Sequence, residues 1–358
     1  MGAIRYNFER VNSIAGDRPV LAVVKADGYG HGAVQISRTL LGAGAHGLAV
    51  AYLEEALEIR EAGISAPVIV LFGLPADKVS YCFDYNLTPV VWSVEQASAL
   101  SGEATRRSSS ITLHIKIDTG MGRLGLHPGE AVESIVRIID MPGLAVEGIL
   151  SHFSDADLAS ADVADAQLEL FRSVDSKLQD RGIRIRFRHM ANSAAVISFR
   201  ASLLDMVRPG LMLYGYNPVP EQSDLDLRPA MTVKSTVISV KRVPTGTPVS
   251  YGRTFCTKRE SLIATMAAGY ADGFSTALSN RGRVIVRGKI APVVGRVCMD
   301  LAMLDVTEVD GVSVGDKVTL IGEEAGHGCW ADAMAGLAGT IPYEILTSIG
   351  KRVTRVYQ

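Results

Sequence analysis

The sequence predicts an α/β fold, a TIM-like (β/α)8 barrel followed by a mostly β C-terminal domain. In the first half, short apolar runs rich in branched residues alternate with amphipathic helical stretches, and eight such runs fit within roughly 200 residues. A doubly wound open sheet would rarely use eight units so evenly, so the barrel is favoured. After about Gly215 the helical stretches give way to alternating segments with turn residues. A chain of 358 residues is long enough for both domains.

The eight expected barrel strands are residues 19–24, 47–51, 67–72, 89–92, 111–117, 144–150, 183–189 and 203–207. Residues 52–63 illustrate the intervening helices, because their apolar positions follow a helical period and Gly63 ends the pattern. We place the barrel at residues 1–226 and the second domain at residues 227–358, joined by the proline-punctuated segment 218–229. In the second domain strands are expected at residues 231–243, 262–266, 283–286, 302–306 and 317–321, before a final amphipathic stretch at 331–349.

Composition excludes several classes of function. The net charge is −2 with no basic run, which argues against binding to nucleic acid or to a membrane surface. No apolar run approaches the length of a membrane span. The four cysteines are far apart and form no CxxC pair, so we expect no disulfide framework, no metal site and a cytoplasmic location.

Two glycine patterns imitate a dinucleotide-binding loop. The first, Gly42-x-Gly44-x-x-Gly47, lies between a helix and the strand that follows it, which is the wrong polarity for binding a pyrophosphate. The second, residues 120–125, follows a strand, but His127-Pro128 intervenes before the next helix. We therefore interpret residues 120–125 as a sharp loop that directs Arg123 into the barrel mouth.

Chemically capable residues follow three of the expected strands. Lys25 comes directly after the first apolar run, where it is either a solvent-facing lysine or a desolvated amine able to form a Schiff base. The seventh and eighth strands lead into Ser193 and into Arg208-Pro209-Gly210-Leu211. These loops commonly bind phosphate in barrels, although Asn-Ser and Pro-Gly are also ordinary turn sequences. A phosphate cup opposite a lysine is more specific than either feature alone.

Nine separated segments, in order along nearly the whole chain, resemble the bacterial alanine racemases. They are residues 24–32 (VKADGYGHG), 116–125 (KIDTGMGRLG), 151–154 (SHFS), 191–194 (ANSA), 208–210 (RPG), 250–253 (SYGR), 269–273 (GYADG), 295–300 (GRVCMD) and 341–344 (IPYE). The chain departs from the family at its start: family members usually begin with a further strand that joins the second domain. Here a helical pattern starts at Ile4, which puts the stability of the second domain in question.

The resemblance implies a pyridoxal 5′-phosphate enzyme that interconverts L- and D-alanine and supplies D-alanine for peptidoglycan. Lys25 is then the lysine that holds the cofactor and one of two acid/base groups, and Tyr251 is the other, acting on the opposite face of the substrate. A phenol is a weak acid at neutral pH, and His189 and Arg208 are the expected aids to its ionisation. Arg208 is expected at the cofactor's ring nitrogen, where a permanently charged group cannot accept a proton.

The resemblance assigns the remaining roles as well. The phosphate-binding set is Tyr29, Asn192, Ser193, Gly210, Leu211 and Tyr343. Arg123 and the backbone N–H of Met299 are expected to bind the substrate carboxylate, and His152 is expected to stack on the cofactor ring. Lys116 matches a position that is often carbamylated, which would orient Arg123, whereas an unmodified Lys116 would pair with a carboxylate. Tyr270 and Asp300 match a narrow channel into the site. The family further implies a homodimer with shared active sites, in which Tyr251 and Met299 come from the partner.

Three alternatives remain open. A serine racemase, perhaps part of a membrane-anchored resistance protein, would share the chemistry, since one extra hydroxyl is only weakly rejected by a small pocket. A non-catalytic pyridoxal-phosphate carrier would resemble the barrel alone and would lack the domain that carries Tyr251. A basic amino-acid decarboxylase would be expected to set a carboxylate, in place of Arg208, against the ring nitrogen.

Overall fold

The computed structural model describes residues 1–156, 162–221 and 223–358, which form two compact units. The first unit consists of Met1–Gly28 and Gly32–Arg228, and the second consists of Tyr29–His31 and Pro229–Gln358. The chain therefore enters the second unit for three residues directly after the Lys25 segment, and then returns to the first.

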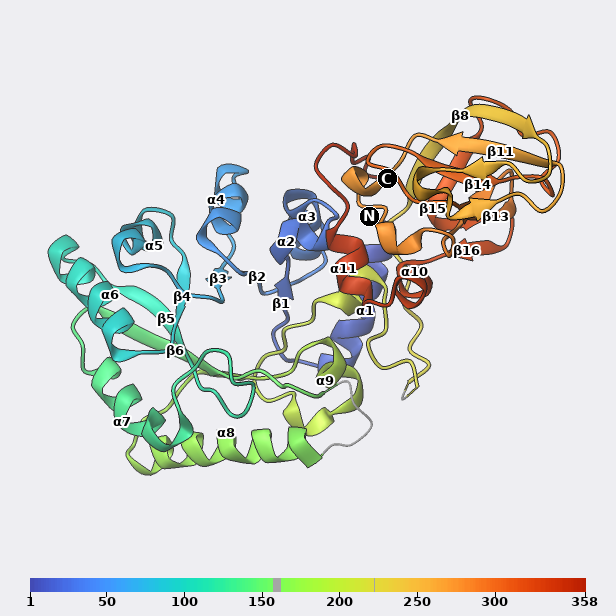
Figure 1. Ribbon diagram of the computed structural model, residues 1–358. Helices are drawn as coiled ribbons and strands as arrows, with labels where there is room; N and C mark the ends of the chain where they lie inside the picture. Colours follow the sequence, from blue (N-terminus) through green and yellow to red (C-terminus); the bar gives the residue numbers. More distant parts are fainter. Residues whose placement is uncertain (157–161, 222) are drawn as a thin grey trace. The chain divides into compact units, whose positions relative to one another are not determined.

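The first unit is built on a parallel sheet that curls in chain order (Figure 1). Its strands are β1 (Leu21–Val23), β2 (Gly47–Val50), β3 (Val68–Val70), β4 (Thr88–Val91), β5 (Ile111–Lys116), β6 (Leu144–Leu150) and β7 (Phe187–His189). The main helices are α1 (Gly2–Ala15), α3 (Ala33–Gly42), α4 (Leu53–Glu61), α5 (Ser80–Asp84), α6 (Val94–Arg107), α7 (Pro128–Ile139), α8 (Asp162–Asp180) and α9 (Ser193–Ser198). The expected barrel of alternating strands and helices is confirmed.

The prediction of an eighth strand at residues 203–207 is wrong in its details. Residues Arg200–Ser202 form a 3-10 turn and Leu204 has a left-handed φ of 39°, so no regular strand can start there. The place of an eighth strand is taken instead by residues 205–207, whose backbone is irregular. Asp205 donates to Arg188 O on one side, and Val207 O accepts from Leu21 N on the other. Irregular backbone thus bridges β7 and β1.

Local sequence accounts for where helices begin. The α7 helix starts with Pro128, whose fixed φ suits the first turn, and the His127 side chain accepts from Gly129 N. Ser93 caps α6 by accepting from Gln96 N. The buried face of α7 repeats at helical spacing through Ala131, Ile135 and Ile138, which packs this helix onto the sheet.

The second unit is a mostly antiparallel β structure. Its long sheet runs in the order β12 (Arg283–Val286), β13 (Lys289–Val294), β14 (Ala302–Asp305), β11 (Ser261–Met266), β8 (Val233–Val243), β15 (Lys317–Glu324) and β16 (His327–Cys329), and β12 also pairs with β15. The hairpin β9 (Pro248–Val249) and β10 (Phe255–Cys256) and the helices α10 (Ala331–Ala338) and α11 (Pro342–Thr347) complete it. The five expected strands are confirmed, whereas β9, β10, β13 and β16 were missed.

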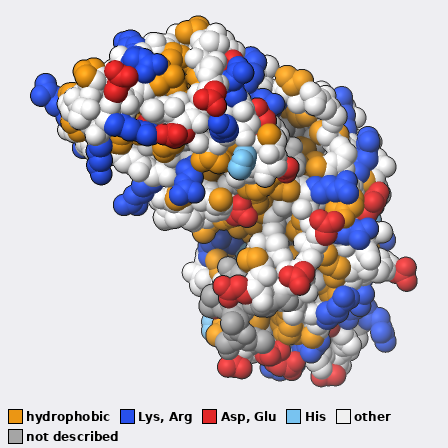
Figure 2. Space-filling view, turned by 90° about the vertical axis from the view of Figure 1, so that its right-hand side faces the viewer, with side chains coloured by type: hydrophobic (Ala, Val, Ile, Leu, Met, Phe, Trp, Pro, Cys, Tyr) orange, Lys and Arg blue, Asp and Glu red, His pale blue; other side chains and the backbone are white. Residues whose placement is uncertain are grey.

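The surface is mixed in charge. On the face drawn in Figure 2, basic and acidic side chains are interspersed. Among the described residues, no helix has both the length and the apolar character needed to cross a bilayer.

Candidate functional site

Three cations surround one aromatic ring at the strand ends of the first unit. The Phe72 ring centre lies 5.6 Å from Lys25 Nζ, 5.9 Å from Lys116 Nζ and 5.6 Å from the Arg123 guanidinium carbon. Lys25 follows β1, Lys116 ends β5, and Arg123 lies in the loop after β5. We call Lys25, Lys116, Arg123 and Arg208 the cation cluster, because they also act electrostatically on one another or on shared neighbours.

Burial and mutual repulsion lower the basicity of both lysines in the cation cluster. Burial, and then Arg123, lower the pKa of Lys25, while Glu55 opposes them. Lys116 is only 4% exposed, and burial, together with Arg123 and Arg208, lowers its pKa to about 8. Both amines therefore reach the neutral, nucleophilic form more readily than an ordinary lysine does.

A single left-handed turn follows Lys25. Ala26, Asp27, Gly28 and Tyr29 have φ values between 52° and 59°, a conformation that costs energy for residues other than glycine. Side chains hold this turn in place: Glu55 Oε1 accepts from Ala26 N at 2.6 Å, and Asp27 Oδ1 accepts from Ala33 N at 2.8 Å. The strain is concentrated beside the candidate cofactor lysine, as is typical of functional sites.

The loop that carries Arg123 is organised by Asp118. One carboxylate oxygen of Asp118 accepts from Gly120 N at 3.1 Å and from Gly122 N at 3.0 Å. Gly125 has a φ of 140°, and a Cβ there would lie 2.3 Å from Asp118 N, so only glycine fits. These constraints place the Arg123 guanidinium beside Phe72.

Arg208 is a buried cation with most of its hydrogen-bonding capacity committed. Nη1 donates to His189 O and His189 Nδ1, both at 2.7 Å. Nη2 donates to Ser151 O at 2.6 Å and Met190 O at 3.2 Å. Burial lowers the pKa of Arg208 to about 10, so the group stays charged at neutral pH. These four bonds leave the Nε–H as the remaining donor.

Ser193 and Asn192 shape the loop after β7. Ser193 Oγ accepts from Gly210 N at 2.8 Å and from Met212 N at 3.3 Å, so its own hydroxyl hydrogen is left to donate. The Gly210 amide, which was expected to bind phosphate, donates to Ser193 in this structure. Asn192 caps α9 through Ala195 N, and Leu211 begins the 3-10 turn after Gly210.

His152 completes the part of the site in the first unit. Burial lowers its pKa well below the usual range, and Arg208 and Lys116 lower it further, so the ring is neutral. Gln167 on α8, which sequence reasoning missed, donates to His152 O at 3.1 Å. Its only signal in the sequence was a polar residue on the apolar face of a helix.

The other expected residues lie in the second unit. The Tyr29 and Tyr343 rings lie 5.9 Å apart, and burial raises the pKa of Tyr29. Tyr251, Tyr270 and Met299 line a shared hollow of about 760 Å³ and are 71%, 45% and 53% exposed. Such exposure is unusual for large side chains gathered in one place and is typical of an interaction surface.

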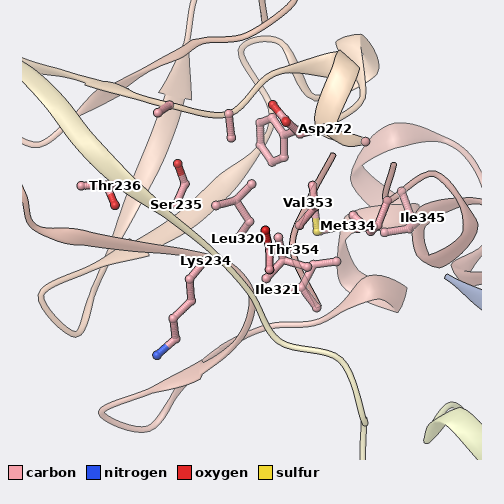
Figure 3. A pocket seen from close by; sticks show the side chains of 16 residues that line it. Lys234, Ser235, Thr236, Asp272, Leu320, Ile321, Met334, Ile345, Val353 and Thr354 are labelled. Carbon is pink, nitrogen blue, oxygen red and sulfur yellow. The ribbon is translucent and has the colours of Figure 1, made fainter. Parts of the chain in front are cut away.

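Asp300 is held by a residue that sequence reasoning missed. Arg352 donates to Asp300 Oδ1 at 2.9 Å and to Asp272 through Nε at 2.7 Å. A second hollow, of about 370 Å³, lies between the sheet and the helices of this unit. Leu320, Met334 and Val353 line it, and the Lys234 ammonium points away from it (Figure 3). Tyr251, Tyr270 and Met299 line the first hollow and not this one, and Asp300, Tyr29 and Tyr343 line neither.

A TIM-like barrel with charged side chains gathered at the carboxyl ends of its strands is typical of an enzyme. The family models for the alanine racemase N-terminal and C-terminal domains match residues 1–218 and 230–357. The chain belongs to the alanine racemase family, whose members are known to depend on pyridoxal phosphate.

Individual relatives match along the whole chain. Alanine racemase 2 of Caldanaerobacter subterraneus is 44% identical over 360 residues, covering 100% of this chain and 93% of the relative. The solved alanine racemase of Clostridium difficile is 34% identical with a TM-score of 0.96, covering 100% of this chain and 94% of that one. An alanine racemase from Bacillus anthracis with bound L-Ala-P is 36% identical with a TM-score of 0.93, covering 99% and 92%.

Proposed function

We propose that this protein is an alanine racemase that interconverts L-alanine and D-alanine with pyridoxal 5′-phosphate held on Lys25. The observation that carries the proposal is the cation cluster, because three cations around Phe72 and a buried Arg208 suit a ligand with several negative charges. A phosphate and a substrate carboxylate supply such charges. Membership in the alanine racemase family supports the same choice of substrate.

The residues in the first unit fit pyridoxal phosphate. The remaining Nε–H of Arg208 suits an acceptor such as a pyridine nitrogen, and the free hydroxyl hydrogen of Ser193 suits a phosphate oxygen. Lys25 offers an amine of lowered pKa for a covalent link. Asn192, Leu211 and the Gly210 amide, which would exchange its bond to Ser193 for one to a phosphate oxygen, are proposed to complete the phosphate site, and His152 to lie against the ring. Tyr29 and Tyr343 are proposed as further phosphate-binding residues.

Racemisation requires two proton-transfer groups on opposite faces of the substrate Cα. When bound, the cofactor supplies an electron sink for the electron pair that is left when the α-proton departs. We assign Lys25 to one face and Tyr251 to the other, so that either group removes a proton while the other delivers one. Arg123 and the Met299 backbone N–H are proposed to hold the substrate carboxylate, since a guanidinium matches a carboxylate geometrically.

Arg208 decides which reaction follows proton removal. A carboxylate at the ring nitrogen would keep that nitrogen protonated, whereas a guanidinium has no proton-accepting site. With the cofactor bound, Arg208 would therefore favour racemisation over transamination. The bonds from Nη1 and Nη2 fix the orientation of this guanidinium.

We further propose a cytoplasmic homodimer with shared active sites. Tyr251, Tyr270 and Met299 are large, exposed and gathered in one hollow, which supports their being covered by a second copy of the chain. In such a dimer Tyr251 and Met299 serve the Lys25 of the partner, and Tyr270 and Asp300 line the channel to it.

The test is to incubate the purified protein and pyridoxal phosphate with L-alanine, and separately with L-serine, while following optical rotation. We expect rotation to decay to zero with L-alanine and to decay much more slowly with L-serine. Preferred turnover of serine would replace the substrate assignment, and no loss of rotation with either amino acid would overturn the proposal.

A further inference from the structure

A chain of four polar side chains leads from Arg208 to the surface of the first unit. Arg208 Nη1 contacts His189 Nδ1 at 2.7 Å, and His189 Nε2 contacts His114 Nδ1 at 2.8 Å. His114 Nε2 lies 3.8 Å from Glu147 Oε2, and Glu147 also accepts from Arg186 at 2.7 Å. His114 and Glu147 have no role in the chemistry proposed above.

The direction of the hydrogen bonds in this chain is determined by its inner end. A guanidinium can only donate, so His189 Nδ1 must be an acceptor and carry no hydrogen. The single hydrogen of neutral His189 is then on Nε2 and is donated to His114 Nδ1. His114 in turn carries its hydrogen on Nε2, facing the Glu147 carboxylate. Both rings are therefore neutral, and each has one defined tautomer.

Burial favours these neutral forms. His114 is 1% exposed and His189 is fully buried. Burial lowers the pKa of both imidazoles, and the charge of Arg208 lowers them further. At His114 the Glu147 carboxylate opposes this shift, but the pKa still lies below its usual value. A second proton on His189 would occupy the nitrogen that Arg208 requires, so protonation would break the chain at its inner end.

The fold makes room for His114. In the pairing of β5 with β6, Leu113 lies opposite Val146 and His114 opposite Gly148, so Glu147 is an extra, bulged residue. Bulges commonly redirect a side chain near a functional site. A Cβ on Gly148 would lie 2.4 Å from His114 Nδ1, so the ring fits only beside glycine.

We infer that His114 and Glu147 are positioning residues that hold His189 in its Nε2–H tautomer and thereby fix the Arg208 guanidinium. This inference rests on the proposed function for its kinetic consequence but not for the tautomer itself. Two bonds favour the Nε2–H tautomer of His189, the one from Arg208 to Nδ1 and the one from Nε2–H to His114. Without His114 only the bond from Arg208 remains, so the population of the Nδ1–H tautomer rises. In that tautomer Arg208 loses one of the four bonds that aim its Nε–H.

Three substitutions of His114 separate this positioning role from packing. His114→Asn places an amide oxygen near the position of Nδ1 and should keep an acceptor for His189. His114→Gln extends its polar end toward Glu147 and leaves that acceptor position empty, and His114→Leu removes both polar ends. Gly148→Ala should push the ring away while leaving His114 in the chain. Denaturant unfolding of each variant measures the effect on folding separately.

The first readout is the nitrogen-15 NMR signal of the His189 ring in the full chain, with and without pyridoxal phosphate. We expect a pure Nε2–H tautomer in the wild type and in His114→Asn, and mixed tautomers in His114→Gln and Gly148→Ala. If His114→Leu does not fold, the comparison of His114→Asn with His114→Gln still tests whether an acceptor at this position fixes the tautomer of His189. A pure Nε2–H signal in all variants would overturn the inference.

The second readout is kinetic and uses the loaded enzyme. We expect kcat for alanine to fall roughly tenfold in His114→Gln and His114→Leu with little change in KM, and His114→Asn to recover most of the loss. Stray transamination per turnover should rise in the same variants. Equal losses in Asn and Gln would contradict the positioning role. If wild-type protein does not racemise alanine, the proposed function fails, while the tautomer measurement still tests the hydrogen-bond chain.

Discussion

The ammonium group of Lys25 lies 5.6 Å from the centre of the Phe72 ring, and the Arg123 guanidinium lies at the same distance from that ring. An aromatic face attracts cations, so one ring offsets part of the repulsion between two positive groups. Burial, and then the remaining repulsion from Arg123, lower the pKa of Lys25, while the Glu55 carboxylate opposes them. Phe72 therefore allows a positively charged site to exist before any anion binds.

Lys25→Ala should abolish the visible absorbance of bound cofactor and all detectable racemisation. The variant retains no amine at this position for a covalent link and no base on this face, and loss of a positioned base alone costs roughly 10²–10⁴-fold. Absorbance spectra and optical rotation measure the two effects. Lys78→Ala is the control, because Lys78 lies in an exposed ion pair with Glu54. Borohydride reduction that fixes the cofactor on another lysine would contradict the assignment.

Lys116 should make the stability of the cofactor-free protein depend on pH. Its folded-state pKa of about 8 lies below the ordinary lysine value of 10.5, so between these values the unfolded chain binds more protons. The free energy of unfolding should therefore gain from this residue as pH rises from about 8 to 10.5, by at most about 1.4 kcal/mol per pH unit.

Urea unfolding in bicarbonate-free buffer, compared with Lys116→Met, measures this gain. The slope against pH should be smaller in Lys116→Met, and unchanged in the exposed control Lys258→Met. Parallel curves for wild type and Lys116→Met would show that Lys116 keeps an ordinary pKa in the folded state.

The same lowered pKa predicts carbamylation of Lys116. Carbon dioxide reacts with the neutral amine, which Lys116 reaches more readily than a solvent-exposed lysine. Carbon-13 NMR in labelled bicarbonate should show one carbamate signal that is lost in Lys116→Ala. The substitution should also raise KM for alanine several-fold, because Arg123 loses a neighbour that orients it. A bare ammonium under ample bicarbonate would favour the unmodified form.

Arg208→Glu should lower racemisation and raise transamination. A carboxylate at the ring nitrogen would keep that nitrogen protonated and spread the developing negative charge into the ring. The ratio of pyridoxamine phosphate formed to alanine racemised measures the change. Arg208→Lys serves as the control, since it keeps a cation but not the planar fork. Reduced racemisation without any amine form of the cofactor would count against the electronic role.

Two inactive variants, Lys25→Ala and Tyr251→Phe, should recover activity when they are unfolded and refolded together. In a heterodimer with shared sites, one site inherits both defects and the other combines an intact Lys25 with an intact Tyr251. Activity should reach at most half that of the wild type per heterodimer. Demonstrated subunit exchange without recovery would falsify the shared site. Lys25→Ala mixed with Lys25→Ala/Tyr251→Phe is the control and should stay inactive.

The sequence predicted the regular elements because their apolar periodicity reflects which face is buried. The strand preceding Lys25 and the helix α4 were predicted within a few residues for this reason. The eighth strand was overpredicted because apolar composition at residues 203–207 does not reveal the left-handed φ of Leu204. Backbone bonds to both neighbours allow that segment to be irregular and still occupy a strand position.

The sequence indicated which residues form the candidate site better than it indicated how those residues are arranged. The left-handed turn after Lys25 is held by Glu55, which is distant in the sequence and belongs to no recognisable motif. His114 and Glu147 are polar residues in two different strands, and the bulge between β5 and β6 brings them together. The register between two strands that are distant in the sequence cannot be predicted from the periodicity within either strand alone.

Tyr29–His31 belong to the second unit although they follow Lys25 almost directly. A Cβ on Gly30 would lie 2.1 Å from Leu346 O, and Gly30 O accepts from Arg355 at 3.1 Å. The second unit consequently cannot be exchanged for that of a relative as one continuous stretch of the gene. A recombination event that exchanges residues 229–358 for those of a relative leaves the three-residue insert behind, matched to a sequence no longer present. Exchange between lineages is thus constrained to partners that agree at both places, which ties the inheritance of the β unit to the segment beside Lys25.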